Sequence, residues 1–478
     1  TDIWRQPNQQ MAGRATNLYS HQTEVGERFY ELKPPFQSWA WRNYARQLKQ
    51  FIAEGHDPPA VIVERGHGNG LDVFIGLRMN DAHDGRIAER DNRHLTYPEI
   101  TMARPVFKDG RIIEENIRGY VSRMKIEHPE LLIGVHPELT RLTALCFDFK
   151  QQRVRDFKLA LIEEAIQKYD ADGVDLDFLR HPLYFKPGEE HANRHLMTDL
   201  IGKIRKALDE AGKDRGRRLK LCVRVLAPLE ACEAIGLDVR TWLENRWIDV
   251  LIAGVVDWVQ LDLDEMVQVA HANDCWVYAS IKVDRYRSDP KVLRGIAANH
   301  YRAGVDGMYL FNFYHNRESS MKQEIGSWEK IRFMDKVYVL NSLGHGHKSG
   351  SHNMLELSLA MRKRIQRSEL GTTLNQPKLP CRLLQGQSVA IPLPIADDHG
   401  EASRHGLNMT ARLNIRVRDL TGGTHILGLD INGKPITKQK FTRDRKFAID
   451  VDPTALNAGE NLLKLSLENA DRTVLSEV

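Results

Sequence analysis

The feature that most constrains this chain is an alternation of short apolar runs with longer helical patterns between about residue 70 and residue 315. Each run is rich in β-branched or aromatic residues and nearly continuous in apolarity, as expected for strands that are buried on both faces. Repeated strand–helix units predict parallel strands joined by right-handed crossovers. The predicted strands are Leu71–Leu77, Leu145–Phe149, Gly173–Phe178, Leu219–Val225, Ile248–Ala253, Trp276–Ile281 and Val305–Phe311.

Helical patterns separate these strands. In the first of them Val154 and Leu161 lie on one apolar face and Lys158 is expected largely off it. Asp238 and Asp289 stand where helix N-caps belong, and a proline follows Asp289 at the first helical turn. The predicted helices are Val154–Tyr169, Arg194–Ala211, Asp238–Trp247, Leu263–Asn273 and Pro290–Ala303.

The strand count favours a closed barrel. Seven predicted strands, with an eighth near Ile3 or before Thr1, fit an α/β fold of the (β/α)₈ TIM-barrel type. A doubly wound nucleotide-binding sheet is disfavoured because no GxGxxG motif follows any strand. We therefore expect a catalytic barrel over residues 1–370.

After about Gln376 the pattern changes to strict alternation of apolar and polar residues. Leu413, Ile415 and Val417 alternate with polar residues, and a later alternating run leads into Asn432-Gly433, a strong hairpin signal. Alternation of this kind predicts strands with one buried face. We expect an antiparallel β-sandwich over residues 377–478.

Composition excludes several classes of function. Lys and Arg number 68 and Asp and Glu 64, a net charge of +4 that is too balanced to indicate a nucleic-acid partner. No apolar run reaches the roughly 18 residues that a membrane span needs. The five cysteines form no CxxC pair, so a structural zinc site is not predicted, and we expect no metal ion and no cofactor.

The densest set of polar residues follows the strand at Gly173–Phe178. A strand through Val174 and Leu176 turns Asp175 and Asp177 to the opposite face. Carboxylates aimed into a barrel near its rim are costly to bury unless they are paired or functional. Asp177 and Asp175 are therefore predicted to be catalytic. The alternative is that Asp175 is a paired support residue and Asp177 caps a loop.

The stretch YDADGVDLDFLRHP, from Tyr169, resembles the fourth-strand signature of glycoside-hydrolase-like barrel families, and QRVRD from Gln152 matches the opening of the helix before it. The stretch also resembles the alpha-amylase family's DGxRxDxxxH, which would give the nucleophile role to Asp177. The chitinase-type DGxDxDxE matches at Asp175 and Asp177, but Leu179 replaces its terminal Glu. The resemblance implies a carbohydrate substrate and a secreted or periplasmic enzyme.

In a barrel of this type the active site lies at the carboxyl ends of the strands. The polar and aromatic residues there are candidates for binding the carbohydrate, because they come together at one barrel face even though each alone suits a solvated loop. They are Arg78, Asn80, Asp81, His83, Arg180, His181, Tyr184, Arg224, Glu230, Trp258, Lys282, Asn312 and Tyr314.

Hydrolysis of a glycosidic bond needs one carboxyl group that is protonated and one that is ionised. We assign the ionised role to Asp177, with Arg180 or Arg224 beside it. Asp257 and Asp284, on strands across the barrel, are the leading candidates for the acid. Asp81 and Glu230 are further candidates for that role.

The sequence leaves other functions open. An excess of arginine and lysine at the rim suits an anionic glycan, uronic or sulfated, although these groups equally neutralise the rim aspartates. A lyase or aldolase that uses Lys282 is a second enzyme hypothesis. A barrel that binds glycans without cleaving them is the hypothesis outside catalysis.

Overall fold

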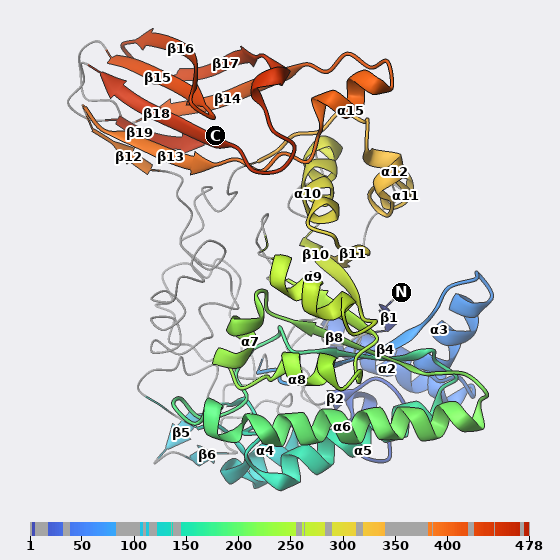
Figure 1. The fold of residues 1–478 in the computed structure, drawn as a ribbon. Helices are drawn as coiled ribbons and strands as arrows, with labels where there is room; N and C mark the ends of the chain where they lie inside the picture. The colour runs from blue at the N-terminus through green and yellow to red at the C-terminus, as the bar shows by residue number, and fades with distance from the viewer. Residues whose placement is uncertain are drawn as a thin grey trace. The chain divides into compact units, whose positions relative to one another are not determined.

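The computed structural model describes residues 2–4, 18–31, 39–82, 106–108, 111–113, 122–134, 136, 145–254, 261, 263–282, 289–311, 319–339, 381–384, 386–418, 425–443, 445–468 and 473–477. Its contacts divide the chain into two compact units (Figure 1). One comprises Thr1–Gly254, Gln268–Val277 and His352–Gly371, and the other Val255–Val267, Tyr278–Ser351 and Thr372–Val478. The expected domain boundary between residues 370 and 377 stays a prediction.

The fold is of mixed α/β class and contains a parallel sheet. Its strands follow one another in the order β1-β4-β7-β8-β9-β10-β11. The seven strands therefore lie side by side in the order in which they occur in the chain, whereas the order of a doubly wound sheet reverses. The strands are β1 Asp2–Trp4, β4 Phe74–Arg78, β7 Gly173–Asp177, β8 Lys220–Val225, β9 Val250–Ala253, β10 Trp276–Lys282 and β11 Gly307–Phe311.

The N-terminal strand and the caps were predicted correctly. The strand expected near Ile3 is β1, which pairs in parallel with β4. Asp238 accepts a hydrogen bond from the Thr241 N–H, and Asp289 accepts one from the Lys291 N–H, so both are N-caps. The five predicted helices are α5 Gln152–Lys168, α6 Glu190–Asp214, α8 Val239–Glu244, α9 Asp264–His271 and α10 Pro290–Arg302.

The closed eight-stranded barrel is not shown by the described strands. The predicted strand Leu145–Phe149 lies outside the sheet, and β4 pairs directly with β7 along five residues. The backbone of Leu145–Phe149 bonds instead to other segments: Cys146 O accepts from the Ile133 N–H at 2.8 Å, and the Phe149 N–H donates to Tyr184 O at 2.8 Å. The described residues therefore form a sheet of seven strands with two edges, where a closed barrel of eight was expected.

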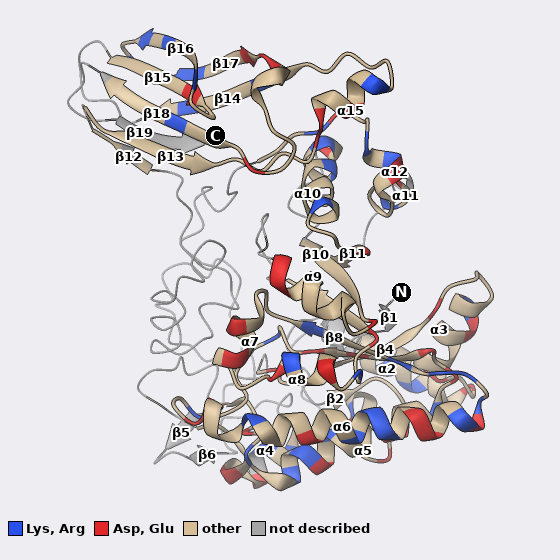
Figure 2. Ribbon diagram, viewed as in Figure 1, with Lys and Arg blue, Asp and Glu red and all other residues tan. Residues whose placement is uncertain are grey.

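In the first unit, helices α5 and α6 contact the sheet at β7 and β8 (Figure 1). Val174 and Leu176 of β7 are fully buried, as are Leu161 and Ile162 of α5. Basic and acidic residues are interspersed along α6 (Figure 2), among them the i,i+4 pair Lys203–Asp199. The other helical segments of this unit are η1 Phe29–Glu31, α2 Trp39–Ala53, α3 Pro58–His67, α4 Arg123–Glu127, η5 Pro129–Leu131 and α7 Leu229–Ala234.

Four short strands complete this unit. They form a parallel pair, β2 Leu18–Tyr19 with β3 Glu27–Arg28, and an antiparallel pair, β5 Val106–Lys108 with β6 Arg111–Ile113. None of the described helices is both long enough and apolar enough to cross a membrane.

In the second unit, β11 pairs in parallel with β10 and α10 packs with α11 Ser319–Ile325 and α12 Trp328–Ile331. Two antiparallel sheets follow, in the orders β12-β19-β14-β17 and β13-β18-β15-β16. Their strands are β12 Cys381–Leu383, β13 Ser388–Pro392, β14 Ala411–Arg418, β15 His425–Ile431, β16 Lys434–Phe441, β17 Arg445–Val451, β18 Leu462–Glu468 and β19 Thr473–Glu477, with α15 His399–Arg404 and η9 Pro453–Ala455 between them.

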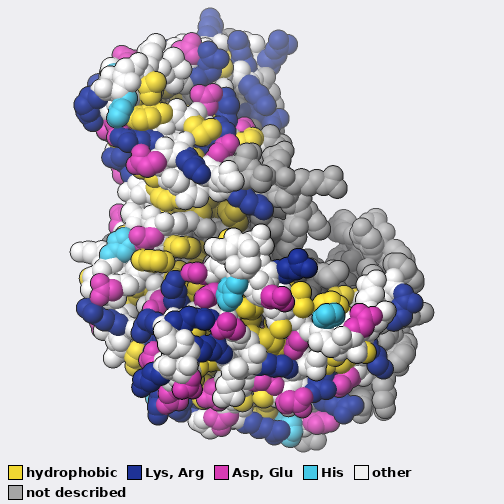
Figure 3. All heavy atoms as spheres, turned by 90° about the vertical axis from the view of Figure 1, so that its right-hand side faces the viewer, with side chains coloured by type: hydrophobic (Ala, Val, Ile, Leu, Met, Phe, Trp, Pro, Cys, Tyr) yellow, Lys and Arg dark blue, Asp and Glu magenta, His cyan; other side chains and the backbone are white. Residues whose placement is uncertain are grey.

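The two antiparallel sheets share one hydrophobic core, to which Val417 of one sheet and Leu427 of the other both belong. The hairpin predicted at Asn432-Gly433 joins β15 to β16. Asn432 and Gly433 have φ values of +55° and +80°, the left-handed pair that a two-residue hairpin of type I′ requires. On the face drawn in Figure 3, basic and acidic side chains are interspersed, in keeping with the balanced composition.

Candidate functional site

Three charged residues stand in one row across three neighbouring strands. Arg78 of β4 is in register with Asp177 of β7, and Asp177 is in register with Arg224 of β8. All three are at or near the carboxyl ends of their strands, the edge where parallel α/β sheets carry their active sites. The row therefore lies where the sequence predicted the site.

The local sequence explains how β7 presents Asp177. The alternation of β7 places Val174 and Leu176 on one face of the strand and Asp175 and Asp177 on the other, and all four are buried. At the start of the strand, a Cβ added at Gly173 would meet the Lys220 carbonyl oxygen at 1.9 Å. Only glycine allows β7 and β8 to approach so closely there. Gly173 is paired with Lys220 in the same register that places Asp177 beside Arg224.

The carboxylate of Asp177 is buried and surrounded by donors. Nη2 of Arg224 lies 2.7 Å from both of its oxygens, and Nε of Arg78 lies 3.8 Å from Oδ2. Oδ1 also accepts the Leu179 N–H at 3.0 Å. Asp177 is only 2% exposed and Arg224 0%. Guanidinium groups and a backbone amide thus compensate the negative charge of an ionised carboxylate at this buried position.

A second carboxylate adjoins the row through Arg78. Nη1 of Arg78 donates to Oδ2 of Asp81 at 2.6 Å, so this arginine links Asp81 to Asp177. Nδ1 of His181 lies 3.2 Å from Oδ1 of Asp81 and 3.0 Å from the Ala82 N–H. Without a proton, Nδ1 accepts a hydrogen bond from the Ala82 N–H; with a proton, Nδ1 donates one to Oδ1 of Asp81. The His181 tautomer therefore decides which contact is a hydrogen bond.

Asp175 lies one step below the row, toward the amino end of β7. It is in register with Gly76 of β4 and Cys222 of β8, and it is 1% exposed. Asp175 is therefore as buried as Asp177 and lies two residues before it in the strand.

Two predicted sugar-binding residues, Asn80 and Tyr184, form hydrogen bonds to backbone groups of other segments or residues. Nδ2 of Asn80 donates to Phe147 O at 2.9 Å and to Leu183 O at 2.7 Å, and Oδ1 accepts the Phe147 N–H at 3.0 Å. The hydroxyl of Tyr184 donates to Phe178 O at 2.6 Å, and its ring is fully buried. These side chains tie chain segments together, and nothing in their contacts supports a role in binding sugar.

Of the remaining predicted site residues, two have described side chains and the others do not. Glu230, near the start of α7, is exposed and Arg180 is partly buried. Lys282 ends β10, but its side chain lies outside the described residues. The other predicted site residues outside the described part of the chain are His83, Asp257, Trp258, Asp284, Asn312 and Tyr314. Among the side chains that are described, no group of three His, Cys, Asp or Glu residues could hold a metal ion.

Sequence reasoning missed two buried lysines next to the row, Lys125 and Lys158. Lys158 was expected off the apolar face of its helix, yet it is 2% exposed. The spacing Val154, Lys158, Leu161 follows the 3.6-residue period of the buried stripe, so the periodicity contained the signal.

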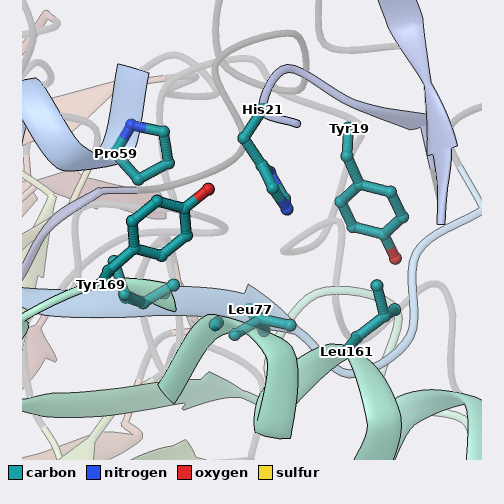
Figure 4. A pocket seen from close by; sticks show the side chains of 9 residues that line it. Tyr19, His21, Pro59, Leu77, Leu161 and Tyr169 are labelled. Atoms are coloured by element: carbon teal, nitrogen blue, oxygen red, sulfur yellow. The ribbon is translucent and has the colours of Figure 1, made fainter. Parts of the chain in front are cut away.

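A small pocket elsewhere in this unit, lined by residues of β4 and α5 among others, is too small for a sugar. Tyr19, His21 and Tyr169 project into it, with Leu77 and Leu161 beneath them (Figure 4). Its volume of about 10 Å³ suits about one water molecule. Burial lowers the pKa of His21 to about 4, so its imidazole is neutral at pH 7. This cavity contains neither Asp177 nor Asp81 and is not the candidate site.

No known family model matches the chain, and no curated protein matches it. Among solved structures, it is similar to the cycloisomaltooligosaccharide glucanotransferase of a Paenibacillus species, at 10% identity over 87% of this chain and 46% of that one, with a TM-score of 0.25. It is also similar to a beta-glucosidase from Paenibacillus barengoltzii, at 12% identity over 77% and 41% of the two chains and a TM-score of 0.23.

A third similar structure is a family GH18 chitinase from Chromobacterium violaceum, at 12% identity over 86% and 78% of the two chains and a TM-score of 0.20. The chain spans less than half the length of the glucanotransferase and of the beta-glucosidase. All three proteins are carbohydrate-active by name. At these TM-scores the likeness carries no argument about this chain, so the chemistry must be argued from its own residues.

Proposed function

We propose that this protein is a glycoside hydrolase whose ionised catalytic carboxylate is Asp177. The observation that carries the proposal is the row Arg78–Asp177–Arg224 at the carboxyl edge of three parallel strands, with Asp81 attached to it through Arg78. A fixed negative charge at that edge suits the stabilisation of a developing oxocarbenium ion. The row holds that charge in one orientation before any substrate arrives.

The reaction needs a second carboxyl group that donates a proton to the leaving oxygen. Asp81 suits this role poorly, because a guanidinium group 2.6 Å from its Oδ2 favours the ionised form. We therefore retain Asp257 and Asp284, the two carboxyl groups predicted from sequence, as the proposed acids. With either partner, Asp177 acts as nucleophile or as general base, according to the distance between the carboxyl groups.

The contacts of the arginines bear on the proposed charge of the substrate. Arg78 and Arg224 are engaged with Asp81 and Asp177, so they neutralise aspartates of the site. This favours a neutral glycan over an anionic one. Arg180 and Lys282 are then the cations proposed to meet a sulfate or uronic group, if the substrate carries one.

A second candidate function is glycan binding without hydrolysis. The observation in its favour is the burial of Asp177, whose two oxygens both face Arg224 and which is 2% exposed. A carboxylate held in this way resembles a structural ion pair as much as a nucleophile. The two functions differ in a direct assay.

The experiment measures release of reducing ends from a panel of neutral, uronic and sulfated polysaccharides. Asp177→Asn keeps the side-chain volume and removes the charge, and we expect turnover to fall by about 10³-fold or more. Because it also leaves Arg224 without its ionised partner, urea unfolding of the variant shows whether the loss occurs in folded protein. The matched control is Asp170→Asn, an aspartate that precedes β7 and pairs with Arg217 at the surface. Full turnover in Asp177→Asn would remove Asp177 from the mechanism, and binding without turnover in the natural protein would favour the second candidate.

A further inference from the structure

Two buried lysines contact the segment that carries the site's second carboxylate. The segment Arg78–Ala82 runs from the last residue of β4 past Asp81. Nζ of Lys125, on α4, donates to Asp81 O at 3.0 Å, and Nζ of Lys158, on α5, donates to Arg78 O at 3.4 Å. Lys125 is 0% exposed and Lys158 2%. Lysines are almost never buried to this degree without a specific partner.

An aromatic ring lies beside both ammonium groups. The ring centroid of Phe147 is 5.2 Å from Nζ of Lys125 and 5.9 Å from Nζ of Lys158. Phe147 is itself bound to the segment, because its N–H donates to Oδ1 of Asn80. The two lysines therefore contact two carbonyls of the segment directly. They also contact the ring of Phe147, whose backbone is hydrogen-bonded to Asn80 of the segment.

The charged groups that act on Lys158 are Lys125 of α4 and Asp81, which follows β4. Burial, and next the charge of Lys125, lower the pKa of Lys158 to about 7, while Asp81 opposes this shift. The proton of Lys158 is thus gained or lost near neutrality. Each change alters the charge next to the carbonyl of Arg78, the residue that joins Asp81 to Asp177.

We propose that Lys125 and Lys158 are positioning residues that hold the Arg78–Ala82 segment so that Arg78 meets both Asp177 and Asp81. They touch the backbone of the segment and act through Arg78 and Asp81, not on a substrate. The contact with the segment stands on the geometry alone. The catalytic consequence rests on the proposed function.

Hydrogen exchange of the backbone amides tests the positioning without any activity assay. The Met79 N–H donates to Asp177 O at 3.0 Å and the Ala82 N–H to Nδ1 of His181 at 3.0 Å, so both amides report on the segment. In Lys125→Met and in Lys158→Met we expect exchange at these amides to accelerate about tenfold or more. The control Leu161→Met, on the same buried face of α5, should change it less than about threefold.

Lys158→Met removes a buried charge and is expected to fold. Lys125→Gln, which keeps a donor, replaces Lys125→Met if the latter does not fold. Unchanged exchange at Met79 and Ala82 in the lysine variants would overturn the proposal, and so would equal acceleration in Leu161→Met.

Kinetics supply the second measurement. In the lysine variants we expect kcat to fall about tenfold while KM changes less than about threefold, since positioning of Arg78 matters most in the transition state. Lys158→Met should also lose an inflection near pH 7 in the pH profile of kcat. An inactive natural protein with accelerated exchange in the variants would refute the glycoside hydrolase and leave the positioning intact. Altered exchange with unaltered kcat and pH profile would overturn the catalytic part of the inference.

Discussion

Arg224 and Asp177 stand opposite each other on neighbouring strands, and Nη2 of Arg224 lies 2.7 Å from both carboxylate oxygens of Asp177. Both side chains are almost fully buried. In a buried ion pair each partner compensates the cost of removing the other from water. Removing one partner is therefore far more harmful than removing both.

Arg224→Met is expected to lower the free energy of unfolding by about 3–5 kcal/mol, because it removes the guanidinium at 2.7 Å from Asp177, whereas Arg78 lies 3.8 Å away. The double variant Arg224→Met, Asp177→Leu should recover most of that loss. Urea unfolding of the three proteins measures both effects. A single variant that costs less than about 1 kcal/mol would show that the pair is not needed for stability.

Asn80→Ala is expected to cost on the order of 3 kcal/mol of unfolding free energy, because it leaves the Phe147 N–H and the carbonyls of Phe147 and Leu183 without their side-chain partner. Asn69→Ala, which removes one exposed bond to Arg65 O, serves as control and should stay within about 0.5 kcal/mol. Thermal unfolding of both variants gives the comparison. Equal small effects would contradict the structural role of Asn80.

The pH dependence of stability should contain a contribution from Lys158. Its pKa falls from 10.5 to about 7 on folding, so between these values the unfolded chain binds a proton that the folded chain has lost. The free energy of unfolding therefore rises with pH across this window, and below pH 7 the burial penalty is at its full value. Unfolding of the natural protein and of Lys158→Met is compared from pH 6 to pH 10. The Met variant should gain relative stability toward pH 6, and parallel curves would contradict a lowered pKa.

A fourth prediction concerns the second unit, where Lys336 joins the helical segment to the antiparallel sheets. Its Nζ donates to Arg332 O at 2.9 Å, to Met334 O at 3.0 Å and to Oδ1 of Asp397 at 2.6 Å. Lys336→Met should cost about 2–3 kcal/mol, since it leaves a partly buried carboxylate and two carbonyls without this donor. Lys446→Met, at an exposed position of β17, is the control and should have little effect on calorimetric unfolding.

Much of the arrangement around Asp177 follows from local sequence. Alternation along β7 predicted that Asp175 and Asp177 share a face, and the charge pattern predicted an arginine, Arg180 or Arg224, beside Asp177. The Asp238 and Asp289 caps were also predicted correctly. These features depend either on the pattern of a few adjacent residues or on the order of the strands. Pattern and order can both be derived from a single sequence.

The failures have a common physical cause. The run at Leu145–Phe149 has the composition of a strand, but its backbone bonds go to Ile133, Leu131 and Tyr184. Asn80 is a polar residue after a strand, and its amide serves the backbone of Phe147 and Leu183. Which distant carbonyl satisfies a donor is a property of tertiary structure. Composition and periodicity do not contain it.

The direct pairing of β4 with β7 has a consequence for engineering. The chain leaves β4 at Arg78 and returns at Gly173 to the strand beside it, so the residues between form an excursion whose length the strand register does not constrain. That excursion nevertheless contains Lys125, Phe147 and Lys158, which are buried and contact the segment Arg78–Ala82 or each other, so shortening it would remove these contacts even where the strand register allows it.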